Sequence, residues 1–270
     1  MNKIIYDSIL NSVEQLIENS SSNSKLSSIV LKHKAKVHFM PMQYRVLAGI
    51  LQSMNIQFGN FLETTIKNIV ATNADNKIIN KYSGKKNNSF RITKEAFALI
   101  DNYITECQLM PFNEKESIHK FNVLLNDIVE AEQDTAKSEK ISHDVDLLFY
   151  QNSTKQYVYA EIKYNDDHDT GKFVDINRKF LLSYALIVNE LNIKKTNQLK
   201  PIIMYFNNKR MKGNIYVPEQ TNIFRGERFF NEFTTIPYSE IDMVFSNISE
   251  NQEIIKKFNE LCERILNSKY

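Results

Sequence analysis

The feature that most constrains the fold is a change of periodicity near residue 143. Before it, apolar residues recur every three or four positions, as in amphipathic helices. After it, HDVDLLFY at 143–150 and KQYVYAEIK at 155–163 are short runs rich in β-branched, aromatic and aliphatic residues, separated by Gln-Asn-Ser-Thr. This pattern predicts a β-hairpin. The chain therefore combines a largely helical first half with a sheet.

The segments after the hairpin predict how the sheet continues. Residues 173–192 have the pattern of a long amphipathic helix, PIIMYF at 201–206 that of a buried strand, and NIYVP at 214–218 that of another short strand. The order strand, strand, helix, strand places a helix across a mixed sheet. The fold class is therefore α/β, a mixed sheet flanked by helices, with a helical N-terminal half.

Helical periodicity accounts for most of the remaining chain, and we expect a single domain. Asn60, after Gly59, is a plausible N-cap that would separate two helices, and the polar, lysine-rich stretch at 75–91 indicates a basic loop. The predicted helices are 3–18, about 42–56, 60–71, about 93–107, 114–133 and about 250–267. The single domain would comprise a helical part at about 1–135, a sheet core at about 140–235 and the C-terminal helix.

Composition excludes several classes of protein. Lysine and arginine total 34 against 32 acids, so the net charge of +2 does not by itself indicate a nucleic-acid partner. The two cysteines, Cys107 and Cys262, have no spacing typical of a zinc site or a disulfide framework. No apolar run approaches the roughly 18 residues of a membrane span, and the N-terminus lacks a signal-peptide core. We expect a cytoplasmic protein.

The hairpin places acids and a lysine at alternating strand positions. Side chains two residues apart share one face of a strand, so Asp144 and Asp146 lie on one face of the first strand, and Glu161 and Lys163 lie together on the second. Two or three carboxylates and a lysine then converge. Phosphodiester hydrolysis needs this combination: carboxylates to hold Mg²⁺, the metal to polarise phosphate and acidify water, and a lysine to orient that water.

These residues and their neighbours resemble the PD-(D/E)xK nucleases, and within them type II restriction endonucleases of the kind typified by TdeIII, MjaII and HinfI. The resemblance rests on HDVDLLF, on AEIKYNDDHDTGKF followed by DINRKFL, on IIMYFNNKRMKGNIY and on the upstream LAGILQSMNIQFGNFLE. It spans roughly residues 40–230. The proline that names the superfamily is replaced by Val145, at a position that is often substituted.

The resemblance implies a role for each site residue. Asp146 would be the first metal ligand, Glu161 the second, the Ile162 carbonyl a third, and Lys163 would position the water. Glu63, in GNFLE, is similar to the upstream helix glutamate that many of these nucleases direct at the metal. Asp144 competes with Asp146 for the role of first ligand, and His143 is a candidate to support the ligands from behind.

Basic residues interleaved with amides are the candidate DNA contacts. Asn207, Asn208, Lys209, Arg210 and Lys212 follow a predicted strand, and such side chains suit the edges of bases. Arg178, Lys179, Lys85 and Lys86 suit phosphates. The neighbouring acids of NDDHDTG, from Asp166 to Asp169, form an expected solvated loop, because so many adjacent acids cannot all turn inward.

The resemblance implies a Mg²⁺-dependent endonuclease that cuts double-stranded DNA at a short palindrome and leaves 5′-phosphate ends. It also implies a homodimer and a cognate DNA methyltransferase in the same host. Two alternatives stay open: a structure-specific repair or recombination nuclease of the same superfamily, and a non-catalytic DNA-binding protein.

Overall fold

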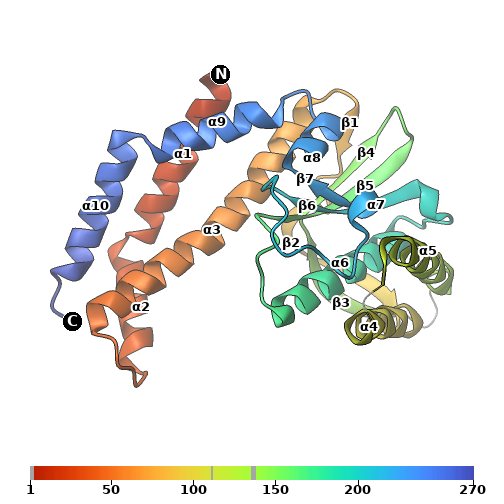
Figure 1. Ribbon diagram of the computed structural model, residues 1–270, viewed down its shortest axis with the longest axis horizontal. Helices are drawn as coiled ribbons and strands as arrows, with labels where there is room; N and C mark the ends of the chain where they lie inside the picture. Colours follow the sequence, from red (N-terminus) through yellow and green to blue (C-terminus); the bar gives the residue numbers. More distant parts are fainter. Residues whose placement is uncertain (1–2, 111, 135–137) are drawn as a thin grey trace. The chain divides into compact units, whose positions relative to one another are not determined.

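The computed structural model describes residues 3–110, 112–134 and 138–270 (Figure 1). The chain forms two compact units. The helical unit comprises the chain up to Thr65 together with residues 236–270, and the sheet unit comprises residues 66–235. Within the described part of the chain, no helix is long and apolar enough to cross a membrane. The prediction of a single domain stays a prediction.

The helical unit packs its helices around apolar side chains. Ile9 and Val244 belong to one buried cluster, and Ile29, Ile50 and Ile265 belong to another. The helices predicted at 3–18 and about 250–267 are confirmed, whereas α2 and α9 are additional to the predicted ones. The elements of this unit are α1 (Lys3–Ser20), α2 (Asn23–Lys34), the first part of α3 (Met42–Thr72), α9 (Tyr238–Ser249) and α10 (Gln252–Leu266).

Helix α3 corrects the prediction of two helices separated at Gly59 and Asn60. The helix is continuous over its 31 residues, so Asn60 is no N-cap. The apolar face persists across the glycine, since Phe58 and Phe61 both pack edge-on against Phe245 of α9. This contact with α9 is not visible in the local sequence.

The sheet unit contains a five-stranded mixed sheet in the order β1-β4-β5-β6-β7 (Figure 1). β4 pairs with β5 antiparallel, and β5, β6 and β7 run parallel. The predicted hairpin is confirmed as β4 and β5, the predicted strand at 201–206 as β6, and the predicted crossing helix as α6 (Thr170–Glu190). The strands are β1 (Asn76–Ile78), β4 (Leu147–Gln151), β5 (Gln156–Lys163), β6 (Leu199–Tyr205) and β7 (Ile223–Arg225), with η2 (Thr196–Gln198) before β6.

Helices cover the sheet. Along each strand, successive side chains point to opposite faces of the sheet. Tyr159 of β5 stacks on Phe180 of α6 (Thr170–Glu190), with ring centroids 5.6 Å apart. Phe149 of β4 and Phe224 of β7 both contact Phe233 of α8 (Gly226–Phe233). The predicted helices at about 93–107 and 114–133 are confirmed as α4 (Lys94–Leu109) and α5 (Glu114–Ala131).

A second sheet corrects two further predictions. The supposed basic loop at 75–91 contains β1 and much of β2 (Gly84–Thr93), and β2 pairs antiparallel with β3 (Ser138–Val145). Its lysines sit on the exposed side, while Phe90 is buried. The strand predicted at 143–150 is also interrupted at Asp146, because β3 pairs with β2 whereas β4 joins the main sheet.

The prediction of a strand at 214–218 is wrong. The Asn214 side chain accepts the amides of Tyr216 at 2.8 Å and Val217 at 3.2 Å, so this segment forms a side-chain-capped turn. Tyr216 and Val217 are buried without strand pairing. After this turn and the short helix α7 (Glu219–Asn222), the strand that extends the sheet beyond β6 is β7.

Candidate active site

Asp146 lies at the junction between the two sheets. The pairing of β4 with β5 stops at Leu147 and Ala160. Just beyond it, the Ile162 amide donates to Asp146 Oδ2 at 3.0 Å. Asp146 is only 6% exposed, so its carboxylate is fixed in place and directed toward the end of β5.

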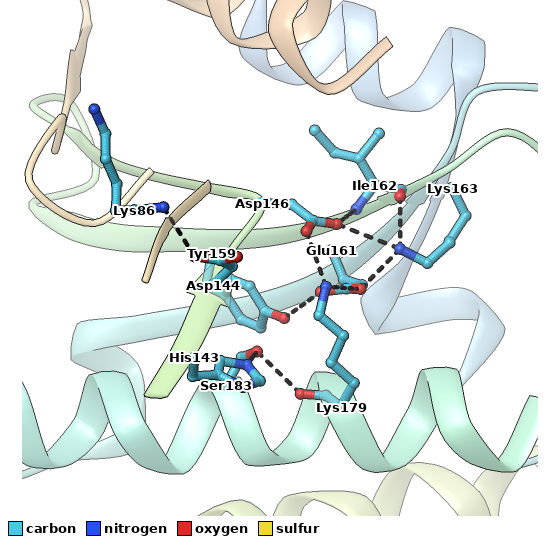
Figure 2. Close-up of polar contacts among 10 residues, drawn as sticks. All are labelled: Lys86, His143, Asp144, Asp146, Tyr159, Glu161, Ile162, Lys163, Lys179 and Ser183. Carbon is cyan, nitrogen blue, oxygen red and sulfur yellow. Dashed lines mark hydrogen bonds and ion pairs between the residues drawn. The ribbon is translucent and has the colours of Figure 1, made fainter. Parts of the chain in front are cut away.

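Glu161 and Lys163 of β5 lie on the same face as Tyr159 and meet Asp146 there (Figure 2). Glu161 is fully buried, and its Oε2 accepts the Tyr159 hydroxyl at 2.8 Å. Lys163 Nζ donates to Glu161 Oε1 at 2.7 Å, to the Ile162 carbonyl at 2.8 Å and to Asp146 Oδ2 at 3.3 Å. The structure thus brings together all three residues of the predicted catalytic set and the predicted carbonyl ligand.

Lys179 is an unexpected fourth member of this cluster. Its side chain rises from α6, and Nζ donates to Glu161 Oε1 at 2.7 Å and to Asp146 Oδ1 at 2.9 Å (Figure 2). The sequence assigned it to phosphate contacts, yet here it bridges the two carboxylates. A signal for its placement existed, because Lys179 lies three residues after Ile176 and four before Ser183, both buried on α6.

Two carboxylates and two ammonium groups balance the charge of the cluster. Burial opposes ionisation of Glu161, but Lys163 and Lys179 outweigh it and lower the pKa of Glu161 from 4.5 to about 2. Burial likewise opposes the charge of Lys179, while Glu161 and Asp146 raise its pKa above the ordinary value. Glu161 is therefore ionised at neutral pH and suited to holding a cation.

Asp144 and His143 occupy different places from the carboxylate pair. Asp144 Oδ1 accepts the amides of Lys86 and Asn87, both at 2.8 Å, and so fixes the irregular start of β2 (Figure 2). His143 Nε2 lies 2.7 Å from Ser183 Oγ, whose hydroxyl donates to the Lys179 carbonyl at 2.9 Å. Burial, helped by the Lys179 charge, lowers the pKa of His143. His143 therefore supports α6 beneath the cluster.

The remaining predicted ligand, Glu63, lies on α3 within the helical unit and is half-buried. Its role at the metal stays a prediction. Across residues 3–110, 112–134 and 138–270, no three His, Cys, Asp or Glu side chains gather as a metal cluster. The metal donors brought together in the sheet unit are thus the two carboxylates and the Ile162 carbonyl.

The predicted DNA contacts fall into two groups. The side chains of Asn208, Lys209, Arg210 and Lys212 are exposed in the loop after β6, where Asn207 is half-buried, and Lys85 and Lys86 are exposed on β2. Arg178, in contrast, donates from Nε to Asp101 Oδ1 of α4 at 2.8 Å.

The number of acids after Lys163 predicted one solvated loop. The structure does not show such a loop. Asp166 is fully buried, which makes the expectation wrong for that residue. Asp167 and Asp169 are exposed, and Asp169 caps α6 by accepting the Lys172 amide at 2.9 Å. Asp166 and Asp169 therefore each have a structural role of their own.

Comparison with known proteins shows the family to which the chain belongs. Residues 1–249 match the family model described as "Type II restriction endonuclease, HinfI". The chain is also 46% identical over 269 residues to the type II restriction enzyme HinfI of Haemophilus influenzae, and the match covers 98% of this chain and 99% of that enzyme. No solved structure gives a significant match. The chain belongs to the HinfI family of type II restriction endonucleases, which are site-specific deoxyribonucleases.

Proposed function

We propose that this chain cuts both strands of double-stranded DNA at a short palindrome, uses Mg²⁺, and leaves 5′-phosphate and 3′-hydroxyl ends. Restriction enzymes act on DNA and generally use a divalent metal. The observation that carries the proposal is the convergence of Asp146, Glu161 and Lys163 at one place on the sheet. A cognate DNA methyltransferase would protect the DNA of the host.

The donor atoms at this place fit Mg²⁺. Mg²⁺ binds through hard oxygen atoms, commonly one or two carboxylates, and keeps several waters. Asp146, Glu161 and the Ile162 carbonyl offer such oxygens, and two ammonium groups already contact them. Because these oxygens already hold two ammonium groups, their environment favours positive charge. Glu63 is proposed as a further ligand.

Each residue then has a distinct task in hydrolysis. When bound, the metal polarises the scissile phosphate and acidifies a water molecule. Asp146 and Glu161 would hold the cation, and Lys163, fixed beside both carboxylates, would orient the attacking water and stabilise the negative charge that develops on the phosphate. A DNA-binding protein without catalytic activity has no need for two buried carboxylates beside a lysine, which favours catalysis over simple binding.

The exposed basic segments would bind the DNA. We assign base contacts to Asn207, Asn208, Lys209, Arg210 and Lys212, and phosphate contacts to Lys85, Lys86 and Arg178. Arg210→Ala should then reduce discrimination at one base pair by about 1–3 kcal/mol. Lys85→Ala should weaken binding to all sequences alike and flatten the salt dependence by about one unit. A uniform loss in both variants, measured by titration of labelled duplexes, would contradict the assignment to bases.

The decisive experiment is digestion of unmethylated phage DNA with Mg²⁺. Discrete bands are expected. A smear would favour a structure-specific nuclease, and intact DNA would favour a binding protein. Asp146→Ala and Glu161→Ala should abolish cleavage and weaken Mg²⁺ binding in calorimetry. Lys163→Ala should bind Mg²⁺ but lose most turnover.

Asp144→Ala separates the two candidates for first ligand. Asp144 contacts the start of β2 rather than the carboxylate pair, so this variant should retain Mg²⁺ binding. If Asp144→Ala lost Mg²⁺ binding and Asp146→Ala kept it, the assignment of the first ligand would have to be reversed.

A further inference from the structure

A buried carboxylate ties the active-site strand to the loop that follows β6. Asp166, three residues after Lys163, has no exposed surface. Its Oδ1 accepts the Met211 amide at 3.0 Å, and its Oδ2 accepts the Gly213 amide at 2.7 Å and Arg225 Nη2 at 3.0 Å. Burial opposes its charge, but these donors keep the pKa of Asp166 below its ordinary value. The carboxylate thus holds two backbone amides of one loop.

Arg225, at the end of β7, is itself held from several sides. Nε and Nη2 donate to the Glu219 carboxylate at 2.7 and 3.1 Å, and the guanidinium lies 5.2 Å from the centroid of the Tyr205 ring. A buried ion pair contributes little net stability compared with apolar packing, although removing one partner is costly. Such a pair is therefore better explained by the conformation that it fixes than by stability.

The backbone joins the same two segments. The Phe206 amide donates to the Lys163 carbonyl at 2.8 Å, and the Asn207 amide donates to the Tyr164 carbonyl at 2.8 Å. The parallel pairing of β5 and β6 ends at Lys163 and Tyr205, and one further backbone hydrogen bond joins the two segments beyond it. The start of the loop is therefore hydrogen-bonded directly to the backbone of Lys163 and Tyr164.

The loop between these anchors presents exposed polar side chains from a constrained backbone. We call residues 207–213 the reading loop. Gly213 has φ +82°, and a Cβ there would lie within 2.9 Å of all three nearest atoms of the Arg210 guanidinium. The resting position of Arg210 therefore depends on a glycine at 213. Asn208, Lys209, Arg210 and Lys212 remain exposed.

We propose that Asp166 and Arg225 are positioning residues for sequence specificity, which set the reading loop at a fixed place relative to Lys163. The proposal rests on the proposed function, in which this loop contacts base edges. Bidentate base contacts require defined positions, and small misplacements of reacting groups reduce rates strongly. A fixed connection between loop and lysine makes cleavage depend on correct reading.

The test compares Asp166→Asn with Asp175→Asn. Asp166→Asn replaces one carboxylate oxygen with an NH₂ group, which cannot accept a hydrogen bond. At the Oδ2 position this group would face the N–H groups of Gly213 and Arg225, and at the Oδ1 position it would face the N–H group of Met211. In Asp175→Asn, the same charge is lost from an exposed position on α6, and Lys212 of the reading loop keeps its ion pair with Asp167. The substrates are the mapped cognate duplex and duplexes with one altered base pair. The readouts are kcat/KM and amide hydrogen exchange of residues 206–214.

Asp166→Asn should lose exchange protection in the reading loop, and its ratio of cognate to altered kcat/KM should fall on the order of tenfold. Asp175→Asn should keep both the protection and the ratio. If Asp166→Asn does not fold, Gly213→Ala, which strains the backbone and displaces Arg210, should lower the ratio instead. Loss of protection with an unchanged ratio would overturn the proposal.

Arg210→Ala distinguishes this failure from failure of the proposed base contacts. If Arg210→Ala changes the ratio but Asp166→Asn does not, only the positioning role is overturned. If neither variant changes the ratio, the reading loop does not contact bases, and that part of the proposed function fails as well.

Discussion

Lys179 gives the carboxylate pair a second ammonium group, so a divalent cation that binds there has to displace it. Lys179→Met should therefore tighten Mg²⁺ binding several-fold, because the metal no longer competes with a tethered charge. In chelator, the same variant should lose stability. The loss of stability should be about 1–2 kcal/mol. It is smaller than the roughly 3–5 kcal/mol for removing one partner of a fully buried ion pair, because the Lys179 side chain is 36% exposed.

Calorimetry with Mg²⁺ and urea unfolding in chelator measure these two effects. Lys172→Met is the matched control, since Lys172 is an exposed lysine near the start of the same helix. It should change neither quantity. Weaker Mg²⁺ binding by Lys179→Met would mean that Lys179 supports the metal site rather than competing for it.

Glu161 predicts how stability depends on pH in the metal-free protein. Its pKa is about 2 in the folded chain against 4.5 ordinarily, so its contribution is complete above about pH 4.5 and is lost as pH falls toward 2. In that window the unfolded state binds one more proton, which gives a slope of about 1.4 kcal/mol per pH unit. Glu161→Gln should lack this part of the slope in urea unfolding at pH 5, 4 and 3. Equal slopes in both proteins would contradict the ionised, ion-paired state.

At the scale of elements, α3 makes a prediction about its two glycines. At Gly59 a Cβ would meet no atom within 4 Å, whereas at Gly49 it would lie 2.8 Å from Ile29 and 3.0 Å from His33 of α2. Gly59→Ala should therefore stabilise the protein by about 0.5–1 kcal/mol, the ordinary gain inside a helix. Gly49→Ala should destabilise it, because α2 has to move. Thermal unfolding of both variants tests the continuous helix, and destabilisation by Gly59→Ala would argue for a break there.

The elements that could be predicted from sequence are those defined by local patterns. The hairpin of β4 and β5 follows from two β-type runs around a short turn, and α6 and β6 follow from clear periodicity. In contrast, β1 forms only by pairing with β4, which lies some seventy residues away along the chain. The break at Asp146 likewise arises because β3 pairs with β2. Neither partner is visible from local sequence.

The site divides in the same way. Strand alternation places Glu161 and Lys163 together, and the hairpin brings Asp146 near them. Helical periodicity could place Lys179 on the buried face of α6, but not the carboxylates that it meets across the sheet. The burial of Asp166 was unpredictable because its partners, Met211 and Gly213, belong to a loop whose position depends on the parallel pairing of β5 and β6.

For the whole molecule, the expected assembly is a homodimer. Each chain presents one Asp146, Glu161 and Lys163 cluster in its sheet unit, and cutting both strands of a palindrome calls for two such clusters related by the two-fold axis of the DNA. The helices α1 and α10 at the ends of the chain are the candidate interface elements. Light scattering with cognate duplex should give two chains per duplex.

A mixed dimer makes this prediction decisive. Chains carrying Lys163→Ala, purified with parental chains through two different affinity tags, should form dimers with one working active site. Such dimers should convert supercoiled plasmid to nicked circles and accumulate them, because the second strand faces the disabled cluster, whereas parental dimers should give linear DNA. The contrary result would be one chain per duplex, together with linear DNA made by the mixed preparation at half the parental rate and without nicked circles. Each chain would then be cutting both strands by itself, and the dimer model would be wrong.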